Sequence, residues 1–386
     1  IRAELAGGGA VTPAAEEDEP EVASPHADDP HAEAIAALPD ASPFVGSGAT
    51  VTSSGALTPD FAVEAQAVLA DLEAWRGRLF TDDLLVEYVA AEDAYADKIN
   101  GWYEPDTKRL VVVENDNAVM GRGTMLHEMF HALQDQLFDL EALHEGAWGG
   151  DATTTGERDR ALRAIIEGEA MLAVAELMDY DFGAHTALPM HGELDEARFE
   201  KVFHYGAGLD FVLALRDAGG WPLVDRAFQD PPTSTMQILH PDRYLAGVTP
   251  EDLGALPGPE CECTEEHEPV EVLGEYALSL FLARDEATRP HSARLAARLA
   301  GDLLHAIEDH ESGAVRHAWY LSLHDDLAAA ELTGILTDTL GLEVWALDTT
   351  GRRIGVLLDE HPLGEGGEVA EDEPDAAASG HGAAGH

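Results

Sequence analysis

The chain has 386 residues, 45% of them hydrophobic, so it is long enough to bury the core of one large domain or two modest ones. Its 75 acidic residues against 22 lysines and arginines give a formal net charge of −53. Such a charge repels nucleic-acid phosphates, so we expect no nucleic-acid partner. No uncharged apolar run reaches membrane-spanning length, so we expect no transmembrane segment.

The acids are not confined to the ends of the chain, because they also crowd residues 135–160 and 191–200. A compact protein with this charge repels itself, and salt screens that repulsion. The composition therefore favours a protein built for a very salty medium, as in halophilic microbes, over an ordinary domain with acidic tails. The first residue is Ile1. A secretion signal removed before it would imply an extracellular or cell-surface location, and an incomplete sequence is the alternative.

The first half of the chain predicts an unstructured segment and then long helices with a few strands. Residues 1–58 are rich in small, polar and acidic residues without periodicity, which predicts a disordered acidic N-terminal segment. Apolar spacing and turn residues predict, in chain order, a helix at 59–78, a strand at 84–89, a hairpin of 101–103 with 109–114, and helices at about 120–136 and 157–179.

Glycine and proline pairs divide the second half into shorter elements. Residues 251–269 are predicted to be an acidic linker and 363–386 a disordered acidic tail, with a C-terminal subdomain at 270–362 between them. The predicted helices are 203–217, 221–228, 233–239, 270–284, 291–304 and 327–340, and the predicted strands are 315–323, 342–347 and 353–358.

The two cysteines, Cys261 and Cys263, are two residues apart, which does not suit disulfide geometry. Two interpretations remain open. The pair could bind a metal together with His267, or the two could be free thiols in a loop.

The central motif is His127-Glu128-Met129-Phe130-His131. In a helix, residues four apart project from one face, so both imidazoles can reach one tetrahedral zinc ion. Glu128 points elsewhere and can instead accept a proton from a water in the open coordination position. Apolar neighbours predict that this helix is buried, and buried histidines need partners.

A catalytic zinc needs a third protein ligand, and the next long helix offers Glu167 and Glu169. The two are about 200° apart around the helix, so only one can face the metal. Small residues, Ala164 and Ala170, share the face of Glu167, which would let the helix approach the histidines. Glu167 is therefore the predicted ligand. Glu169 is then either an indirect helper or an ordinary helix acid.

These motifs resemble the gluzincin metallopeptidases, which include thermolysin and the aminopeptidase N group. In those aminopeptidases the glutamate that opens a Glu-Gly-Xaa-Ala string is the third zinc ligand, which implies Glu167 here. The segment Tyr205-Gly206-Ala207-Gly208 is similar to their Tyr-Xaa-Xaa-Gly segment, whose tyrosine stabilises the oxyanion. The resemblance thus implies that role for Tyr205.

A closer resemblance is to uncharacterised bacterial and archaeal HExxH proteins with a HALQDQ string, present here as residues 131–136. They share the turn Tyr103-Glu104-Pro105 and the stretch 231–241, so the resemblance covers about 95–350.

The chain also departs from the gluzincin pattern. The gap from His131 to Glu167 is 36 residues (167 − 131), so an insertion such as Gly146–Gly156 is expected to loop out. The aminopeptidase Gly-Xaa-Met-Glu-Asn string is missing from the sequence, so exopeptidase specificity is unsupported. Met171 replaces the acid that supports the metal in thermolysin. Asp135 could take over that support or lie on the surface.

Two further features have open interpretations. His240 could be a second oxyanion donor, as the thermolysin resemblance implies, or a histidine that interacts with a helix C-terminus. The strand Arg109–Glu114 is expected at the sheet edge beside the motif helix, where it could hydrogen-bond an extended peptide or be purely structural.

The sequence thus predicts an α+β protein with a zincin-like catalytic domain at 59–250, a small sheet plus active-site helices, followed by further helices and a small C-terminal α/β part. It predicts a zinc metallopeptidase acting on a peptide or protein substrate, with His127, His131 and Glu167 as ligands and Glu128 as base. The alternatives are a zinc amidohydrolase such as peptide deformylase, whose third ligand is an upstream cysteine, and a non-catalytic zinc-binding surface module. The oligomeric state is open.

The charge of −53 predicts that salt stabilises the folded chain. The melting temperature should fall steadily as KCl is lowered from molar to millimolar levels, because self-repulsion is then unscreened. A melting temperature that is constant across this series would contradict the halophilic interpretation.

Overall fold

The computed structural model describes residues 46–53, 59–89, 100–113, 118–149, 152–180, 194–254, 270–308 and 315–363. All of them belong to the larger of two compact units of the chain, residues 44–386. Cys261, Cys263 and the tail from 364 onward lie outside the described residues, so the predictions for them stay predictions. The fold is α+β, as predicted. Within the described ranges, no helix is long and apolar enough to cross a membrane.

The first sheet has the strand order β1-β2-β4-β3. Its members are β1 (Val51–Ser53), β2 (Leu84–Val89), β4 (Arg109–Val113) and β3 (Gly101–Glu104). Strands β1, β2 and β4 are parallel to one another, and β3 is antiparallel to β4. The predicted hairpin is confirmed. The prediction that residues 109–114 form the edge strand is wrong, because β4 pairs on both sides and β3 is the edge strand.

Strand β1 lies inside the segment 1–58 that the sequence predicts to be disordered, so that prediction is wrong for residues 46–53. Val51 pairs with Leu84 of β2, and Gln66 of the following helix bonds to both Val51 N and Ala49 O. A strand of three residues has too few positions to show an alternating pattern, which is why composition alone missed it.

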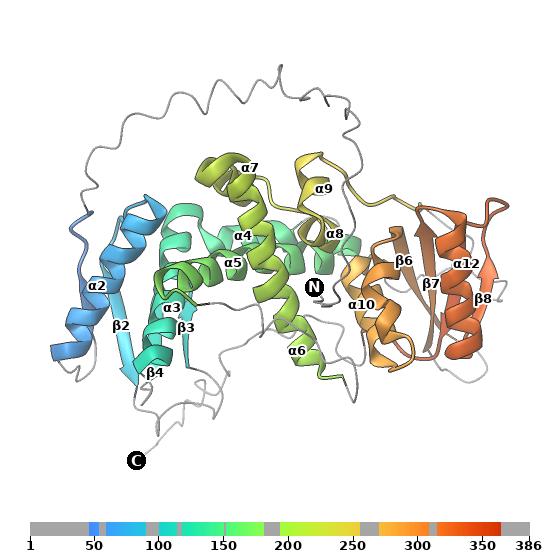
Figure 1. Cartoon of the computed structure of the whole chain (residues 1–386), viewed down its shortest axis with the longest axis horizontal. Coiled ribbons are helices and arrows are strands. Elements are labelled where there is room, and N and C mark those ends of the chain that lie inside the picture. The colour runs from blue at the N-terminus through green and yellow to red at the C-terminus, as the bar shows by residue number, and fades with distance from the viewer. Residues whose placement is uncertain are drawn as a thin grey trace, which may run out of the picture. The chain divides into compact units, whose positions relative to one another are not determined.

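Two long helices pack against this sheet, and a third long helix packs against both of them and against the short connecting helix (Figure 1). They are α2 (Pro59–Arg76), α3 (Ala118–Phe138) and α5 (Thr155–Leu177), and their shared core includes Leu69, Leu72, Val86, Leu110, Leu126, Met129, Phe130 and Ala173. Each large apolar side chain buried in this way stabilises the fold by about 1.5–3 kcal/mol. The sheet and α3 are thereby fixed relative to α5.

The expected insertion loop before α5 is largely a helix. Helix α4 (Leu140–Trp148) begins at Asp139, whose side chain accepts a hydrogen bond from Ala142 N, and a short turn of helix, η2 (Ala152–Thr154), precedes α5. Asp139 has a left-handed backbone with φ of 57°, a conformation that aspartate tolerates better than most residues. The loop prediction for 146–156 is therefore wrong for its first residues.

The second half continues with α6 (Glu196–Lys201), the π-helical turn η3 (Val202–Ala207), α7 (Gly208–Gln229), α8 (Thr235–Leu239) and α9 (Pro241–Leu245). Of these, η3, α7 and α8 lie against α5. The predicted break between two helices is a kink inside α7, where Gly220 has φ of 67°. Only glycine adopts such a backbone at little cost, so the Gly219-Gly220 pair allows this kink.

The C-terminal part is built on a second sheet with the order β5-β6-β7-β9-β8. Its strands are β5 (Val270–Glu271), β6 (Leu299–Glu308), β7 (Val315–Leu323), β9 (Arg353–Leu358) and β8 (Glu343–Ala346). Every pairing is antiparallel, so this part is α+β and the predicted α/β part is wrong. An α/β sheet would need parallel strands.

Helices cover one face of this second sheet (Figure 1). They are α10 (Gly274–Arg284), η4 (Arg289–His291), α11 (Ser292–Ala296), α12 (Asp326–Gly334) and η5 (Ile335–Thr339). The predicted helix 291–304 is wrong beyond Ala296, because the chain there enters β6 and pairs along β7. Sheet pairing overrides the helical spacing of Leu299, Leu303 and Leu304.

Two buried carboxylates connect the halves of the described chain. Glu157 at the start of α5 accepts hydrogen bonds from Thr235 N and Thr235 Oγ1 of α8. Asp302 of β6 accepts from Leu273 N and Gly274 N at the start of α10. A Cβ on Gly274 would lie 2.0 Å from Glu157 Oε2, so only glycine fits at this contact.

Burial raises the pKa of Glu157 to about 8, and the nearby Asp302 raises it further while Thr235 and Arg160 oppose the shift. Burial also raises the pKa of Asp302. A carboxyl with a raised pKa binds its proton more tightly in the folded state than in the unfolded state. Its contribution to stability is complete below its ordinary pKa and is lost as pH rises through the folded-state value.

We therefore expect the free energy of unfolding to fall between pH 4.5, the ordinary pKa of a glutamate, and about pH 8 by up to ~1.4 kcal/mol per pH unit. Glu157→Gln should flatten this slope, because a neutral amide has no proton to lose. Denaturant unfolding in molar KCl at several pH values measures both slopes, and Glu360→Gln, an exposed acid, is the control. Equal slopes in wild type and Glu157→Gln would contradict the assignment.

Candidate metal centre

Helix α3 has one apolar face and one face that carries His127 and His131. Residues on the apolar side pack against α2 and the first sheet, and they are Met125, Leu126, Met129, Phe130 and Leu133. With 3.6 residues per turn, this packing directs His127 and His131 away from that core toward α5. Glu128 is buried as well and has an exposed fraction of 9%.

The structure brings three predicted ligands together. His127 Nε2 lies 3.0 Å from His131 Nε2 and 3.0 Å from Glu167 Oε2, and His131 Nε2 lies 3.5 Å from that oxygen. Within the described ranges, this is the single cluster of three or more His, Cys, Asp or Glu donors that could hold a metal ion. Two nitrogens and one oxygen around a tetrahedral zinc ion lie about 3.3 Å apart, so the spacing fits such an ion.

The orientation of His131 is set by Gln134. The amide nitrogen of Gln134 donates to Ile166 O at 3.0 Å and to Glu169 Oε2 at 2.9 Å, and both of these atoms can only accept. Gln134 Oε1 must therefore be the atom that lies 2.8 Å from His131 Nδ1. His131 then carries its proton on Nδ1, which leaves the Nε2 lone pair free for a metal.

Glu169 is fully buried and accepts a hydrogen bond from Gln134, so it is not an ordinary exposed helix acid. This contact favours the indirect-helper interpretation. Its other oxygen accepts from Arg76 Nε at 2.6 Å, and Arg76 Nη2 also bonds to Asp225 Oδ1 at 2.5 Å. Arg76 lies over the ring of Trp221 at 4.3 Å. A chain of hydrogen bonds thus runs from Asp225 of α7 and Arg76 of α2 to Glu169. It continues from Glu169 through Gln134 to His131.

Glu128 lies between the metal cluster and the edge strand β3. A Cβ on Gly101 of β3 would lie 3.1 Å from Glu128 Cγ and 2.8 Å from Val111 O, so glycine lets the strand pass close to the carboxylate. The side chain of Glu128 is thus held between β3 and α3. It is not a member of the three-donor cluster, in agreement with its predicted separate role.

The pKa shifts follow from burial and mutual charge. Burial raises the pKa of Glu128, which His127 and His131 partly offset. Burial also acts to raise the pKa of Glu167, but the two histidines hold it well below its ordinary range. The raised pKa favours proton uptake by Glu128, whereas the lowered pKa of Glu167 favours its anionic form, the form in which a carboxylate can bind a metal.

Tyr205 lies beside the cluster, as predicted. Its ring centroid is 5.9 Å from that of His127, and it belongs to the π-helical turn η3. Single π-helical turns inside helices are frequent at functional sites, because they re-aim side chains.

The position of η3 depends on a backbone contact between two glycines. A Cβ on Gly168 would lie 2.1 Å from Gly208 C, and a Cβ on Gly208 would lie 2.0 Å from Ala164 O. Any larger residue would push α5 and α7 apart and move Glu167 away from Tyr205. Of the two small residues on the face of Glu167, Ala164 lies at this contact with α7. Ala170 packs in the core that α5 shares with α3, as the sequence predicts.

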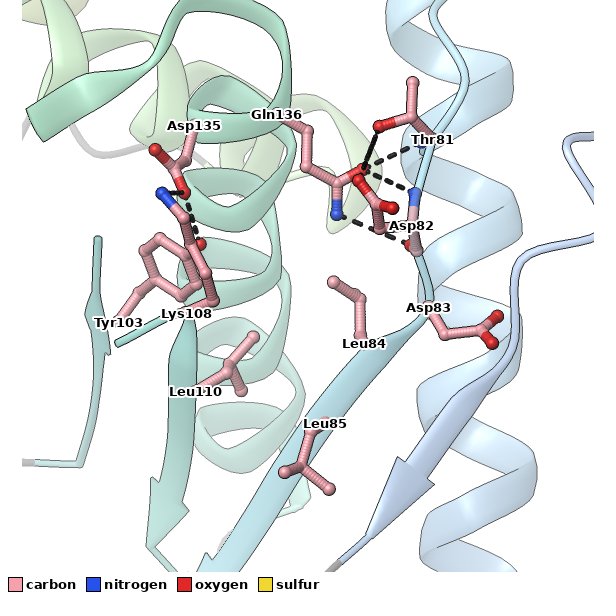
Figure 2. A pocket seen from close by; sticks show the side chains of 10 residues that line it. All are labelled: Thr81, Asp82, Asp83, Leu84, Leu85, Tyr103, Lys108, Leu110, Asp135 and Gln136. Carbon is pink, nitrogen blue, oxygen red and sulfur yellow. Dashed lines mark hydrogen bonds and ion pairs between the residues drawn. The ribbon is translucent and has the colours of Figure 1, made fainter. Parts of the chain in front are cut away.

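Asp135 has neither of its two predicted roles. It is buried and accepts from Tyr103 Oη at 2.6 Å, from Lys108 Nζ at 2.8 Å and from Leu140 N at 3.1 Å. It therefore ties the end of α3 to the β3–β4 hairpin and to α4. Figure 2 shows it beside Tyr103 and Lys108 at a pocket of about 220 Å³, opposite Gln136 and Thr81.

His240 is placed at the junction of α8 and α9 and bonds to Glu275 of α10 at 2.9 Å. It is the C-cap residue of α8, which agrees with the helix-terminus interpretation. His240 therefore has two neighbours of negative character, the carboxylate of Glu275 and the C-terminal end of α8.

Sequence reasoning missed two members of the site. Gln134 was noted only within the HALQDQ string, although its spacing of three from His131 places the two on adjacent turns. The role of Arg76 could not be predicted, because its partner Glu169 is 93 residues away.

Comparison with protein families, with curated proteins and with solved structures finds no match. The gluzincin resemblance and the zincin fold therefore stay predictions.

The geometry separates the roles of the two glutamates. Glu167→Gln should abolish tight zinc binding, because an amide oxygen is a poorer ligand than a carboxylate. Glu169→Gln should weaken zinc binding by no more than about 10–100-fold. It should also lower the stability of the chelator-treated chain by about 3–5 kcal/mol, because Arg76 loses a buried partner.

Competitive chelator titration and denaturant unfolding measure the two properties independently. Zinc lost from Glu169→Gln but kept by Glu167→Gln would show that the ligand is assigned to the wrong face of α5.

Proposed function

We propose that this chain is a zinc-dependent peptidase that uses His127, His131 and Glu167 as metal ligands. The observation that carries the proposal is the convergence of these three donor atoms within 3.5 Å of one another. The donor set of two imidazoles and one carboxylate is the set that catalytic zinc prefers, with a fourth position left for water. The Nδ1 proton of His131, fixed by Gln134, supports this assignment.

Zinc held by these three residues would supply a water of lowered pKa and would polarise a carbonyl. Glu128 is the group that would accept the water's proton and donate it to the leaving amine. Burial raises the pKa of Glu128, which favours proton uptake and so supports this role. Tyr205, beside His127, donates its hydroxyl proton in a hydrogen bond to the developing oxyanion.

A peptide is the substrate class that fits the surroundings best. The edge strand β3 has an unpaired side in the sheet that the described residues form, and it passes Glu128 at Gly101. An extended peptide can hydrogen-bond to such an edge as an added strand, which would bring its carbonyls to the metal cluster.

Substitutions in the motif test the proposal. His127→Ala and His131→Ala should each abolish zinc binding, because two ligands cannot hold the ion tightly. Glu128→Gln should keep the zinc and the fold but lose at least about 100-fold in hydrolysis, because an amide cannot accept a proton. The measurements are metal content and cleavage of unfolded casein in molar KCl, with and without chelator.

His291→Ala, at an exposed histidine of η4, is the matched control and should change neither property. Casein cleavage by Glu128→Gln at the wild-type rate would refute the mechanism, and full zinc content in both histidine variants would refute the site.

A further inference from the structure

Basic side chains gather at one end of the second sheet, in a chain that has 75 acids against 22 lysines and arginines. Arg298 directly precedes β6, His324 directly follows β7, Arg352 directly precedes β9, and Arg243 belongs to the nearby helix α9. These four residues are called the arginine corner below. Like charges that lie together repel one another, so a cluster of this kind favours the binding of an anion.

Hydrogen bonds to the backbone hold the corner together. His324 N donates to Arg298 O at 2.9 Å, which joins the end of β7 to the start of β6. Arg243 Nη2 donates to Ala297 O at 3.2 Å, and Arg352 Nη1 donates to His324 O at 3.5 Å. The corner is therefore a built part of the fold, in which two guanidiniums lie against the backbone that carries the other two members.

The acids that contact the corner compensate its charge only in part. Asp325 forms an ion pair with Arg298. Glu275 is shared, because it bonds to His240 at 2.9 Å and lies 3.9 Å from Arg243 Nη1. That nitrogen of Arg243 is buried and has no hydrogen-bond partner among the described residues. One carboxylate thus serves both an imidazole and a guanidinium, which leaves part of the positive charge of Arg243 uncompensated.

Arg352 has no acid of its own. In the part of the chain that the structure describes, its guanidinium bonds to the carbonyl of His324 and forms no ion pair. It acts electrostatically on Glu251, but that carboxylate already accepts from Arg353 Nη2 and from Ser322 Oγ. A guanidinium has five N–H donors, so Arg352 keeps donors for a ligand.

The imidazole of His324 lies among the other three members. Partial burial lowers the pKa of His324, and Arg243, Arg298 and Arg352 lower it further, whereas Glu275 opposes the shift. Three guanidiniums against one carboxylate give the space around this imidazole a positive potential. His324 is exposed, Arg352 is half-buried and the side chain of Arg298 is 49% exposed, so an anion can reach all three from solvent.

We propose that the arginine corner binds a phosphate group, held by Arg298, His324 and Arg352, with Arg243 adding charge from below the surface. A phosphate group carries a charge of about −1.5 to −2 at pH 7 and three strong acceptor oxygens. The three contacting residues stand at the ends of three different strands. That arrangement suits a tetrahedral group better than a planar carboxylate, which a single guanidinium can bind through both oxygens. The proposal goes beyond the peptidase function and does not depend on it.

The phosphate group can be free inorganic phosphate or part of a small phosphate monoester. Equilibrium dialysis of the full chain against labelled inorganic phosphate and labelled glycerol phosphate separates these two sources. The chain is treated with chelator, so that no metal can bind the phosphate, and KCl keeps the ionic strength constant. We expect saturable binding of one phosphate group per chain. Binding of both probes assigns the corner to the phosphate of a monoester, and binding of inorganic phosphate alone assigns it to the free ion.

Arg298→Gln and Arg352→Gln should each weaken this binding by about 10–100-fold, because each removes a charged donor from the phosphate oxygens. Arg352→Lys keeps the charge but not the paired donors, so it should lose less than Arg352→Gln. Arg316→Gln is the matched control. It removes an exposed arginine at the opposite end of β7, and it should bind phosphate as the wild-type chain does.

Thermal unfolding supplies a second measurement and checks that each variant folds. A ligand that binds only the folded chain raises its melting temperature, so phosphate should raise that of Arg316→Gln as much as that of the wild type. Any rise in Arg352→Gln should be smaller and should reflect only the general effect of phosphate on burial. Failure of both probes to bind saturably, or wild-type binding by both glutamine variants, would overturn the inference.

Discussion

The buried carboxylate of Glu169 is the group on which the geometry of the metal cluster depends. It accepts from Arg76 of α2 and from Gln134 of α3, and it is itself part of α5, so one side chain fixes three helices. Arg76 extends the network to α7 through Asp225. A buried ion pair adds little net stability compared with apolar packing, but it permits only one arrangement of its partners. Here that arrangement places the Nε2 of His131 beside Glu167.

The contact between Gly168 and Gly208 supplies the complementary constraint. Glu169 orients His131 through Gln134. The two glycines let the backbone of α7 lie directly against the backbone of α5. Gly168 lies between Glu167 and Glu169 in sequence, so three consecutive residues take part in the three-donor cluster, the helix contact and the buried network. A small change of register in α5 would disturb all three, which makes this helix the least tolerant element of the site.

Elements with a repeating apolar face could be predicted well from the sequence, and elements that depend on distant pairing could not. Helices α3 and α5 and strands β2 and β7 appear where their patterns placed them, because each buries a repeating apolar face. The sequence predicts a helix where β6 lies and no strand where β1 lies. Both segments are strands because they pair with strands that are distant in sequence. The three donors could be predicted because histidines four apart on a helix have one geometry. Arg76 and Asp225 could not, because only the fold brings them near Glu169.

The charges of the protein fall into two classes that respond differently to salt. The many exposed acids repel one another over distances comparable with the Debye length, and salt screens that repulsion. The buried groups, Glu128, Glu157 and Glu169 among them, are surrounded by fixed partners and low dielectric, where mobile ions hardly reach. High salt can therefore stabilise the fold without weakening the interactions that hold His131 and Glu167 in place.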